Sequence, residues 1–381
     1  MSISVALPLA PPAKSPLARY RLLSPTASIR VSPLCLGGMS FGDAWKDLMG
    51  SCDQATTESI LDYYYSQGGN FIDTSCNYQR QQSERWIGEW MKKRGVRDEM
   101  VIATKFTINF HAGLGHQEII ANFQGNGPKS LRLAVNGSLA KLQTDYIDIL
   151  YVHWFDFSSS IPALMQSLNH LIASGKVLTL GISDAPAWVV AKCNEYARNN
   201  GLQQFSIYQG RWNASRRDFE REIIPMCRAE GMGILPWGVL GSGAFKTEAQ
   251  RQKETENREG RDVSPRDQDI AVSKVLEEIG RRKGTSLTAI AQAYVAAKVP
   301  YVVPIIGCRK VEHLKGSIEA LTIHLTDDEI EEIEATTPFD PGFPNDFMYG
   351  PKIPKTVQDV WILRMGGEFD YVPETKSLTR D

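Results

Sequence analysis

Four ionisable side chains stand at or just after the ends of three short apolar runs. Phe71-Ile-Asp73 ends in a carboxylate, Val101-Ile-Ala-Thr-Lys105 in a lysine, and the run 147–153 in His153. Tyr78 follows Asp73 closely enough for a loop to fold its phenol back over the strand end. Apolar runs of this length, bounded by polar residues, are typical of buried strands. An Asp, a Tyr, a Lys and a His at three strand ends therefore form a candidate proton-transfer site.

These residue types suit one reaction. A free tyrosine has a pKa of about 10, which is too high for an efficient acid near neutral pH. We expect the Lys105 ammonium beside the phenol to favour the phenolate and lower that pKa. Asp73, which needs a partner if it is buried, would hold Lys105 in place. With His153 donating a hydrogen bond to a substrate carbonyl, Tyr78 could protonate the carbonyl oxygen while a hydride reaches the carbon.

The residues and their flanks resemble those of aldo-keto reductases over residues 31–325. The four-residue set of that family falls on Asp73, Tyr78, Lys105 and His153, with Tyr78 as the proton donor. Other family-like phrases are Gly-Gly-Asn-Phe-Ile-Asp-Thr (68–74), Ser83-Glu84 with Ile87-Gly88, Lys-Leu-Gln-Thr-Asp-Tyr-Ile-Asp (141–148) and Gly175-Lys-Val. The segments 84–90, 151–154, 184–190 and 207–213 resemble in particular the fungal branch that holds aryl-alcohol dehydrogenases and norsolorinic acid reductase.

Composition excludes several classes of protein. The chain has 381 residues and a formal net charge of −2, so it has no nucleic-acid-binding footprint. No apolar run reaches the roughly 18–20 residues that a membrane span needs, and the apolar start is broken by prolines, unlike a signal peptide. Six scattered cysteines without a Cys-x-x-Cys pair indicate free thiols in a reducing compartment, which we take as cytoplasmic. Cys76 lies between Asp73 and Tyr78. Its position is compatible with a nucleophile or with a small residue of the loop.

Strand-like and helix-like segments alternate along most of the chain. The predicted strands are 34–37, 71–73, 101–105, 147–153, 178–183, 205–209, 233–236 and 302–306. The predicted helices are 53–67, 82–93, 129–143, 161–174, 186–199, 219–230, 270–283, 286–298 and 311–320. We expect residues 1–18 to form a loose arm, and residues 19–32 a hairpin that caps one end of the fold.

This α/β alternation allows a closed parallel barrel or an open doubly wound sheet. An open dinucleotide-binding sheet would show Gly-x-Gly-x-x-Gly after its first strand, whereas this chain reads Gly-Gly-Met-Ser-Phe-Gly at 37–42. In a barrel, active-site residues gather at the carboxyl ends of several strands, as the ionisable residues do here. That distribution and the family resemblance together predict a (β/α)8 TIM barrel over residues 19–334.

Three segments are additional to the strands and helices of a minimal barrel. They are 107–128, 241–268 and the aromatic-rich tail 335–381. We expect the tail to lie over the active-site face, since loops and tails there set substrate choice. Its aromatic residues either line a pocket for a flat substrate or pack the tail on the barrel, and the two functions are compatible. The candidate pocket residues are Trp154, Phe347, Tyr349 and Trp361.

The resemblance implies a nicotinamide cofactor at later strand ends. Ser183 and Gln209 fall where the family holds the carboxamide, with Asp184 in place of the usual Asn, which removes a hydrogen-bond donor. Trp237 falls at the position of a stacking aromatic residue, although it could be an ordinary rim tryptophan. Gly241, Ser242 and Lys246 would then belong to the loop over the pyrophosphate.

Arg309 and Lys310 precede a predicted helix and suit the extra phosphate of NADPH, although such a pair is often only solvated surface. The family usually has Gln, Glu and Asn near positions 313, 316 and 317, where this chain has His313, Gly316 and Ser317. This departure weakens the expected adenosine contacts. NADPH/NADP+ is nevertheless the expected cofactor.

The sequence thus predicts an NADPH-dependent reductase of aromatic aldehydes or ketones, reversible, of the norsolorinic acid reductase type in fungal polyketide metabolism. An aryl-alcohol dehydrogenase of general metabolism is the alternative within this class. A regulatory subunit with little turnover is another, because the resemblance extends to channel-associated β subunits that keep the same four residues. A metal enzyme is a third, although the six histidines include no His-x-x-x-His pair. No sequence feature predicts the oligomeric state.

Overall fold

Eight parallel strands form a nearly closed barrel in the computed structural model, which describes residues 7, 9–113, 119–256, 261, 263–351, 354, 356–370 and 375–378. The sheet order is β10-β3-β4-β5-β6-β7-β8-β9, and a parallel bridge between Ile234 and Val302 joins its two edges. The strands are β3 (Cys35–Gly37), β4 (Phe71–Asp73), β5 (Val101–Phe106), β6 (Ile147–Val152), β7 (Val177–Ser183), β8 (Phe205–Arg211), β9 (Gly233–Trp237) and β10 (Ile305–Gly307). The predicted (β/α)8 fold is confirmed.

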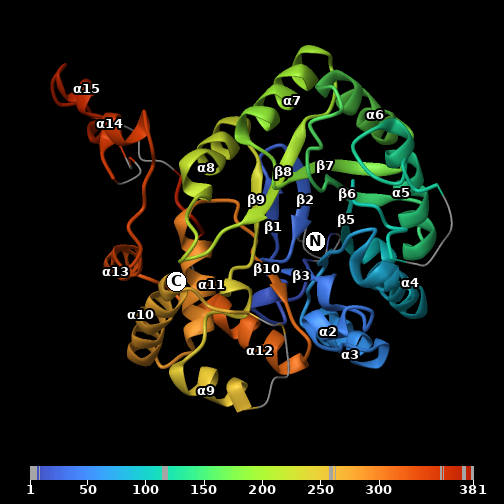
Figure 1. The fold of residues 1–381 in the computed structure, drawn as a ribbon, viewed down its shortest axis with the longest axis horizontal. Coiled ribbons are helices and arrows are strands. Elements are labelled where there is room, and N and C mark those ends of the chain that lie inside the picture. Colours follow the sequence, from blue (N-terminus) through green and yellow to red (C-terminus); the bar gives the residue numbers. More distant parts are fainter. Residues whose placement is uncertain are drawn as a thin grey trace.

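Helices surround the barrel (Figure 1). They are α3 (Gln54–Ser66), α4 (Gln82–Arg94), α5 (Pro128–Leu142), α6 (Ile161–Ala173), α7 (Ala187–Asn199), α8 (Phe219–Glu230), α10 (Asp267–Lys283), α11 (Leu287–Lys298), α12 (Val311–Glu319) and α13 (Asp327–Ala335). Their ends follow from the sequence. Asp53 caps α3 by accepting from the Thr56 amide, and Gly231 and Gly284 end α8 and α10 with φ values of 64° each, which glycine adopts without strain.

A short antiparallel hairpin closes the amino-terminal end of the barrel, as predicted for residues 19–32. It consists of β1 (Arg21–Ser24) and β2 (Ala27–Val31). Leu23 and Val31 are fully buried in the same apolar cluster as the inward-facing side chains of the strands. At the start of β9, an added side chain at Gly233 would lie 2.3 Å from the Leu23 carbonyl oxygen, so only glycine permits this close approach. The hairpin is therefore a plug on the barrel floor.

The insertion at 241–268 contains a helix that the sequence did not predict. α9 spans Glu248–Glu256, and η5 (Gly241–Gly243) precedes it. The shorter elements elsewhere are α2 (Lys46–Met49), α14 (Asn345–Tyr349), α15 (Trp361–Arg364) and the 3-10 turns η1 (Pro16–Ala18), η2 (Gly38–Ser40), η3 (Tyr78–Gln81), η4 (Arg97–Glu99), η6 (Ala320–Thr322) and η7 (Val357–Asp359). Of the two loop histidines, His111 stacks on Phe123, and His116 lies outside the described residues.

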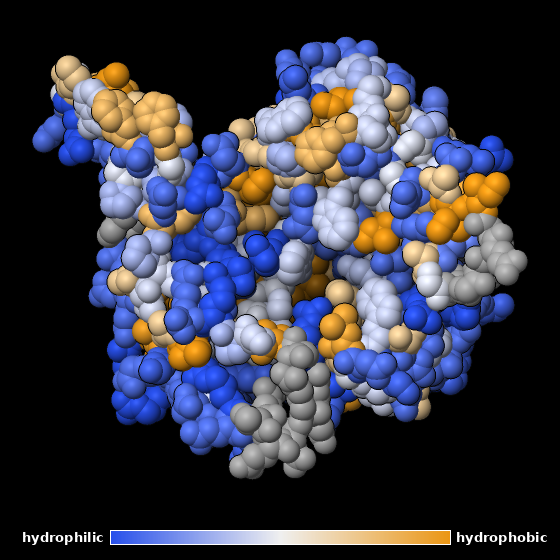
Figure 2. Space-filling model, viewed as in Figure 1, coloured by the Kyte–Doolittle hydropathy of each residue, from blue (hydrophilic) through white to orange (hydrophobic). Residues whose placement is uncertain are grey.

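The described part of the tail projects away from the barrel, whereas the sequence led us to expect the tail over the active-site face. Figures 1 and 2 show α14 and α15 projecting as an arm outside the ring of helices, beyond α8 and α13. The arm leaves the barrel at Phe339, whose ring lies 5.1 Å from the Arg217 guanidinium carbon, and Arg221 donates to the Asp340 carbonyl. These contacts anchor the tail at the start of α8 and direct it outward.

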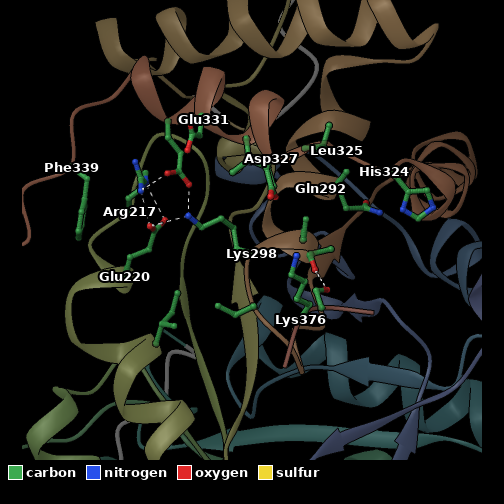
Figure 3. A pocket seen from close by; sticks show the side chains of 18 of the residues that line it. Arg217, Glu220, Gln292, Lys298, His324, Leu325, Asp327, Glu331, Phe339 and Lys376 are labelled. Carbon is green, nitrogen blue, oxygen red and sulfur yellow. Dashed lines mark hydrogen bonds and ion pairs between the residues drawn. The ribbon is translucent and has the colours of Figure 1, made fainter. Parts of the chain in front are cut away.

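Figure 3 shows a groove on the outer surface that this tail helps to line, between α8, α11 and α13. Arg217 and Lys298 form ion pairs there with two carboxylates, those of Glu220 and Glu334. Because Glu220 is buried, this network is a structural clamp between α8, α11 and α13. Among the described residues, no helix combines the length and apolar character that a membrane crossing needs.

Candidate active site

The structure brings the four predicted ionisable residues together at the carboxyl ends of β4, β5 and β6. Lys105 donates to Asp73 Oδ1 at 2.5 Å and to the Thr74 carbonyl at 2.7 Å, and its Nζ atom lies 4.9 Å from the centre of the Tyr78 ring. The His153 and Tyr78 rings meet edge to face with centroids 6.0 Å apart. An ammonium has three protons, so the third remains for the Tyr78 hydroxyl.

Burial changes the expected acidity of Tyr78. Removal from solvent raises the pKa of the Tyr78 phenol, and the nearby Lys105 charge opposes this only in part. The expectation that Lys105 leaves a net lowered pKa is therefore not met. Burial lowers the pKa of Lys105, but the Asp73 charge and the hydrogen bonds of Lys105 with Asp73 and Tyr78 outweigh it, so that this pKa is raised. At neutral pH the pair is a charged ammonium beside a protonated phenol.

His153 is held as a neutral imidazole. Burial and the Lys105 charge place the pKa of His153 well below its ordinary value. The Ser75 hydroxyl lies 3.3 Å from His153 Nδ1 and holds that edge of the ring. The other edge is therefore free to face a ligand beside Tyr78.

The turn that carries Tyr78 is strained. Gln79, Arg80 and Gln81 have φ values of 50°, 48° and 76°, a left-handed conformation that costs non-glycine residues roughly 1–2 kcal/mol each. The buried Gln79 side chain holds the turn by accepting from the Trp45 amide and donating to the Met39 carbonyl. Strain of this kind persists where surrounding contacts fix the backbone, and it clusters at functional sites.

Gln209 lies on the floor of the site rather than on its wall. Its side-chain amide donates to Asp73 Oδ2 at 2.8 Å, so both oxygens of this buried carboxylate are bonded. Because Gln209 Nε2 is engaged with Asp73, the residue serves first to fix Asp73. Its predicted contact with a carboxamide would use Oε1 or the second N–H of Nε2.

The Asp184 carboxylate binds the two tryptophan side chains that line the site. Its Oδ2 atom accepts hydrogen bonds from Trp237 Nε1 at 3.1 Å, Trp154 Nε1 at 3.4 Å and the Ser183 hydroxyl at 3.2 Å. Its backbone has a φ of 44°, which Asp tolerates better than most residues. Burial raises the pKa of Asp184, and the three donors oppose this rise. The carboxylate therefore fixes two indoles, one of which is next to His153.

Comparison with known proteins identifies the family of the chain. The model of the aldo/keto reductase family matches residues 33–337. The chain belongs to this family. It is 52% identical over 380 residues to norsolorinic acid reductase A of Aspergillus parasiticus. This alignment covers 98% of this chain and 96% of the relative. It is also 52% identical to norsolorinic acid reductase B of Dothistroma septosporum (94% and 93% covered) and 51% identical to an aryl-alcohol dehydrogenase of Pestalotiopsis microspora (98% and 96% covered).

Family membership establishes the class of reaction. Aldo-keto reductases are oxidoreductases that act on carbonyl and alcohol groups of small molecules, generally with NADH or NADPH. The resemblance predicted from the sequence is thus confirmed at the level of family, fold and enzyme class.

The residues proposed for a nicotinamide cofactor in this aldo-keto reductase fit such a group. Trp237 ends β9 and points to the barrel mouth, and η5 follows it with left-handed backbone at Gly241, Ser242 and Gly243, which favours an anion-binding concavity of backbone N–H groups. Lys246 follows this loop.

The residues proposed for the extra phosphate lie at the start of α12. Arg309 and Lys310 directly precede the helix, and their charges, together with burial, lower the pKa of His313 in its first turn. Helix N-termini and guanidinium groups both favour phosphate. The donors are thus of the right chemistry for NADPH.

Of the proposed pocket residues, only Trp154 lies at the site. Phe347 and Trp361 contact each other in the projecting arm, where Trp361 Nε1 donates to the Phe347 carbonyl. Tyr349 lines the outer groove. Aromatic content alone could not reveal which surface the tail follows. Cys76 is buried and its pKa is raised to about 12, so it is a packing residue and not a nucleophile.

Sequence reasoning missed a second buried ion pair beneath the site. Glu84 of α4 is fully buried, accepts from the Thr104 hydroxyl and pairs with Lys141 of α5 at 2.6 Å. Lys141 also donates to the Cys76 carbonyl at 2.9 Å, which ties the pair to the loop that carries Tyr78. Both residues occur in family-like phrases, but neither phrase indicates that they meet.

Proposed function

We propose that this protein reduces an aromatic aldehyde or ketone to the alcohol with NADPH, reversibly, and acts in fungal polyketide metabolism. The observation that carries the proposal is the position of Lys105, bonded to Asp73 and directed at the Tyr78 ring. No other described group at the site combines a proton with a neighbouring cation that can stabilise the conjugate base.

In the proposed reaction the substrate carbonyl oxygen lies between Tyr78 and His153. The His153 imidazole donates a hydrogen bond that orients this oxygen, and Tyr78 gives it a proton. Lys105 stabilises the resulting phenolate by its charge, and Asp73 holds Lys105 in place. The hydride for the carbonyl carbon would come from NADPH when it is bound.

Residues beyond this set would hold the cofactor. Ser183, Asp184 and Gln209 would face the carboxamide, Trp237 the nicotinamide ring, and the loop of Gly241, Ser242 and Lys246 the pyrophosphate. Arg309 and Lys310 would bind the additional phosphate, with His313 beside it. Trp154 forms a flat wall next to His153, with ring centroids 4.9 Å apart, and so supports an aromatic substrate.

The polyketide role rests on the relatives. Two proteins named norsolorinic acid reductase and one named aryl-alcohol dehydrogenase align over nearly the whole chain at 51–52% identity. The names "reductase" and "dehydrogenase" describe the two directions of carbonyl–alcohol interconversion, and the second name specifies an aryl alcohol. Both are compatible with one reversible reaction.

The test is titration with NADPH and NADH, followed by tryptophan fluorescence, and then loss of nicotinamide absorbance with a panel of aromatic aldehydes and ketones. We expect tight NADPH binding and turnover in the parent protein, and binding without turnover in Tyr78→Phe. Substantial turnover in Tyr78→Phe would remove Tyr78 as the acid. Binding without turnover in the parent would favour a regulatory subunit, and no binding of either cofactor would contradict the whole assignment.

A further inference from the structure

The side chains of β8 that face the barrel axis form three layers. Ile207 is fully buried in the barrel core, and Gln209, 3% exposed, binds Asp73. Successive side chains of a strand point to opposite faces, so Arg211 continues the same inward-facing row one layer higher. It is the last residue of β8 and it is exposed. Arg211 therefore stands at the mouth of the site, directly above Gln209.

The surroundings of Arg211 place it on the wall of the pocket. It pairs in register with Trp237, and its guanidinium carbon lies 5.9 Å from the centre of the Trp237 ring. Trp237 in turn is bonded to Asp184. Within the part of the chain that the structure describes, no carboxylate forms an ion pair with Arg211.

A second arginine lies in the turn after β8. Arg216 closes this turn through two backbone hydrogen bonds with Asn213. Burial and the charges of Arg266 and Arg211 lower its pKa, while Asp269 and Asp218 oppose this weakly. Arg266 is bound by Asp269, but Arg216 makes no ion pair with any described carboxylate. Arg216 thus lies in the turn directly after Arg211, and neither guanidinium group forms an ion pair with a described carboxylate.

This arrangement suits an anion supplied by a ligand. Like charges repel at short range, and a guanidinium group binds the two oxygens of a carboxylate or phosphate with parallel hydrogen bonds. On α8, α10 and α11 several basic side chains form ion pairs, among them Arg221, Arg281, Arg282 and Lys298. Arg211 and Arg216, in contrast, lie at the carboxyl end of β8 and in the turn that follows it, on the face of the barrel that carries Tyr78 and His153.

We propose that Arg211 and Arg216 form a subsite for an oxyanion, and that the substrate is an aromatic carbonyl compound bearing an acidic group such as a carboxylate or ionised phenol. This inference rests on the proposed function and deepens it, because Arg211 lies against Trp237, and Asp184 joins Trp237 to Trp154 beside His153. A cofactor phosphate has the same chemistry and is the competing source of the anion.

The test compares benzaldehyde with 2-, 3- and 4-carboxybenzaldehyde in the parent, Arg211→Gln, Arg216→Gln and the double variant. We expect the ratio of kcat/KM for the best carboxylated aldehyde to that for benzaldehyde to fall about ten- to a hundredfold in Arg211→Gln, the range for a hydrogen bond between charged partners. Arg281→Gln removes an exposed arginine from the far end of α10 and is the matched control, whose ratio should equal that of the parent.

Other results would overturn the subsite. An unchanged ratio in the double variant excludes a role in substrate recognition. An unchanged ratio with a Kd for NADPH raised about tenfold or more assigns the two arginines to the cofactor phosphate instead.

Binding of benzoate, followed by tryptophan fluorescence, tests the subsite without turnover and so separates its failure from failure of the proposed function. We expect the Kd for benzoate to rise about tenfold in Arg211→Gln but not in Arg281→Gln. Equal benzoate affinity in the parent and Arg211→Gln would overturn the proposal even if no aldehyde in the panel were reduced.

Discussion

Gln209 donates its side-chain amide to Oδ2 of Asp73 across the interior of the barrel, at 2.8 Å. The two residues are on β8 and β4, which are not neighbours in the sheet. Lys105 on β5 occupies the other oxygen of the same carboxylate. Three strands thus fix one ammonium group, and the position of that group decides how Tyr78 behaves.

Replacing Gln209 by Leu should release one oxygen of Asp73. A lost hydrogen bond to a charged buried group costs about 1.5–3 kcal/mol, so we expect the free energy of unfolding to fall by that amount. We also expect kcat to fall, because Lys105 loses its fixed position. Urea unfolding and steady-state kinetics measure both effects. Gln203→Leu is the control, because Gln203 is only half-buried and its side-chain amide donates to the uncharged Leu178 carbonyl. Equal stability losses in both variants would contradict a special role for Gln209.

The raised pKa of Tyr78 predicts opposite pH profiles for the two directions. Reduction needs the protonated phenol, which persists until pH exceeds its ordinary value of about 10, so kcat for reduction should be flat below that pH and fall above it. Oxidation needs the phenolate, so its kcat should rise over the same range. A reduction rate that already falls near neutral pH would contradict this assignment.

Removing Lys141 should leave Glu84 as an unpaired charge in the protein interior. Breaking a buried ion pair in this way costs about 3–5 kcal/mol, so Lys141→Met should lower the free energy of unfolding by that amount. Lys93→Met is the matched control, because Lys93 pairs with Glu58 at the surface and should contribute less than about 1 kcal/mol. A loss in Lys141→Met no larger than in the control would contradict burial of the pair.

Asp184→Asn tests what the carboxylate contributes beyond hydrogen bonding. The amide oxygen of Asn can still accept from Trp154 and Trp237, but the negative charge is gone. A negative charge near the nicotinamide stabilises its oxidised, positive form, so we expect the variant to bind NADP+ about tenfold more weakly relative to NADPH. Fluorescence titration with each form gives the ratio, and an unchanged ratio would show that Asp184 acts only as an acceptor.

Arg309→Ala should weaken NADPH binding about ten- to a hundredfold and NADH binding much less, because only NADPH carries the additional phosphate. Lys315→Ala, which removes a cation from the middle of the same helix, is the control. Titration of both cofactors against both variants measures the difference. Equal weakening of NADPH and NADH in Arg309→Ala would remove Arg309 from the phosphate site.

Much of the fold and the assembly of the ionisable residues could be predicted because each signal is local. Asp73, Lys105 and His153 stand at or just after the ends of apolar runs, and parallel strands in a barrel bring such ends to one face. The partner of Gln209 could not be predicted, because it depends on which side chains meet across the barrel. The net acidity of Tyr78 depends on its depth of burial, which residue types do not show.

The path of the tail and the position of Arg211 at the site were not predicted from the sequence, for different reasons. The aromatic residues of the tail indicate that it packs on something, but the anchoring contact between Phe339 and Arg217 joins segments far apart in sequence. Arg211, in contrast, could have been found by continuing the two-residue alternation of β8 past Gln209. Chain periodicity is readable from sequence only as far as the strand is known to extend.

The three layers of β8 differ in what a change in each would alter. Ile207 belongs to the apolar core of the barrel, and Gln209 to the hydrogen-bond network that positions Lys105. Arg211 belongs to the rim of the barrel mouth. A substitution at the rim leaves the two lower layers, those of Gln209 and Ile207, unchanged. New ligand preferences can therefore arise on this barrel without a change in the stability of its fold or in the residues that transfer the proton. In this way one barrel can serve enzymes with different names.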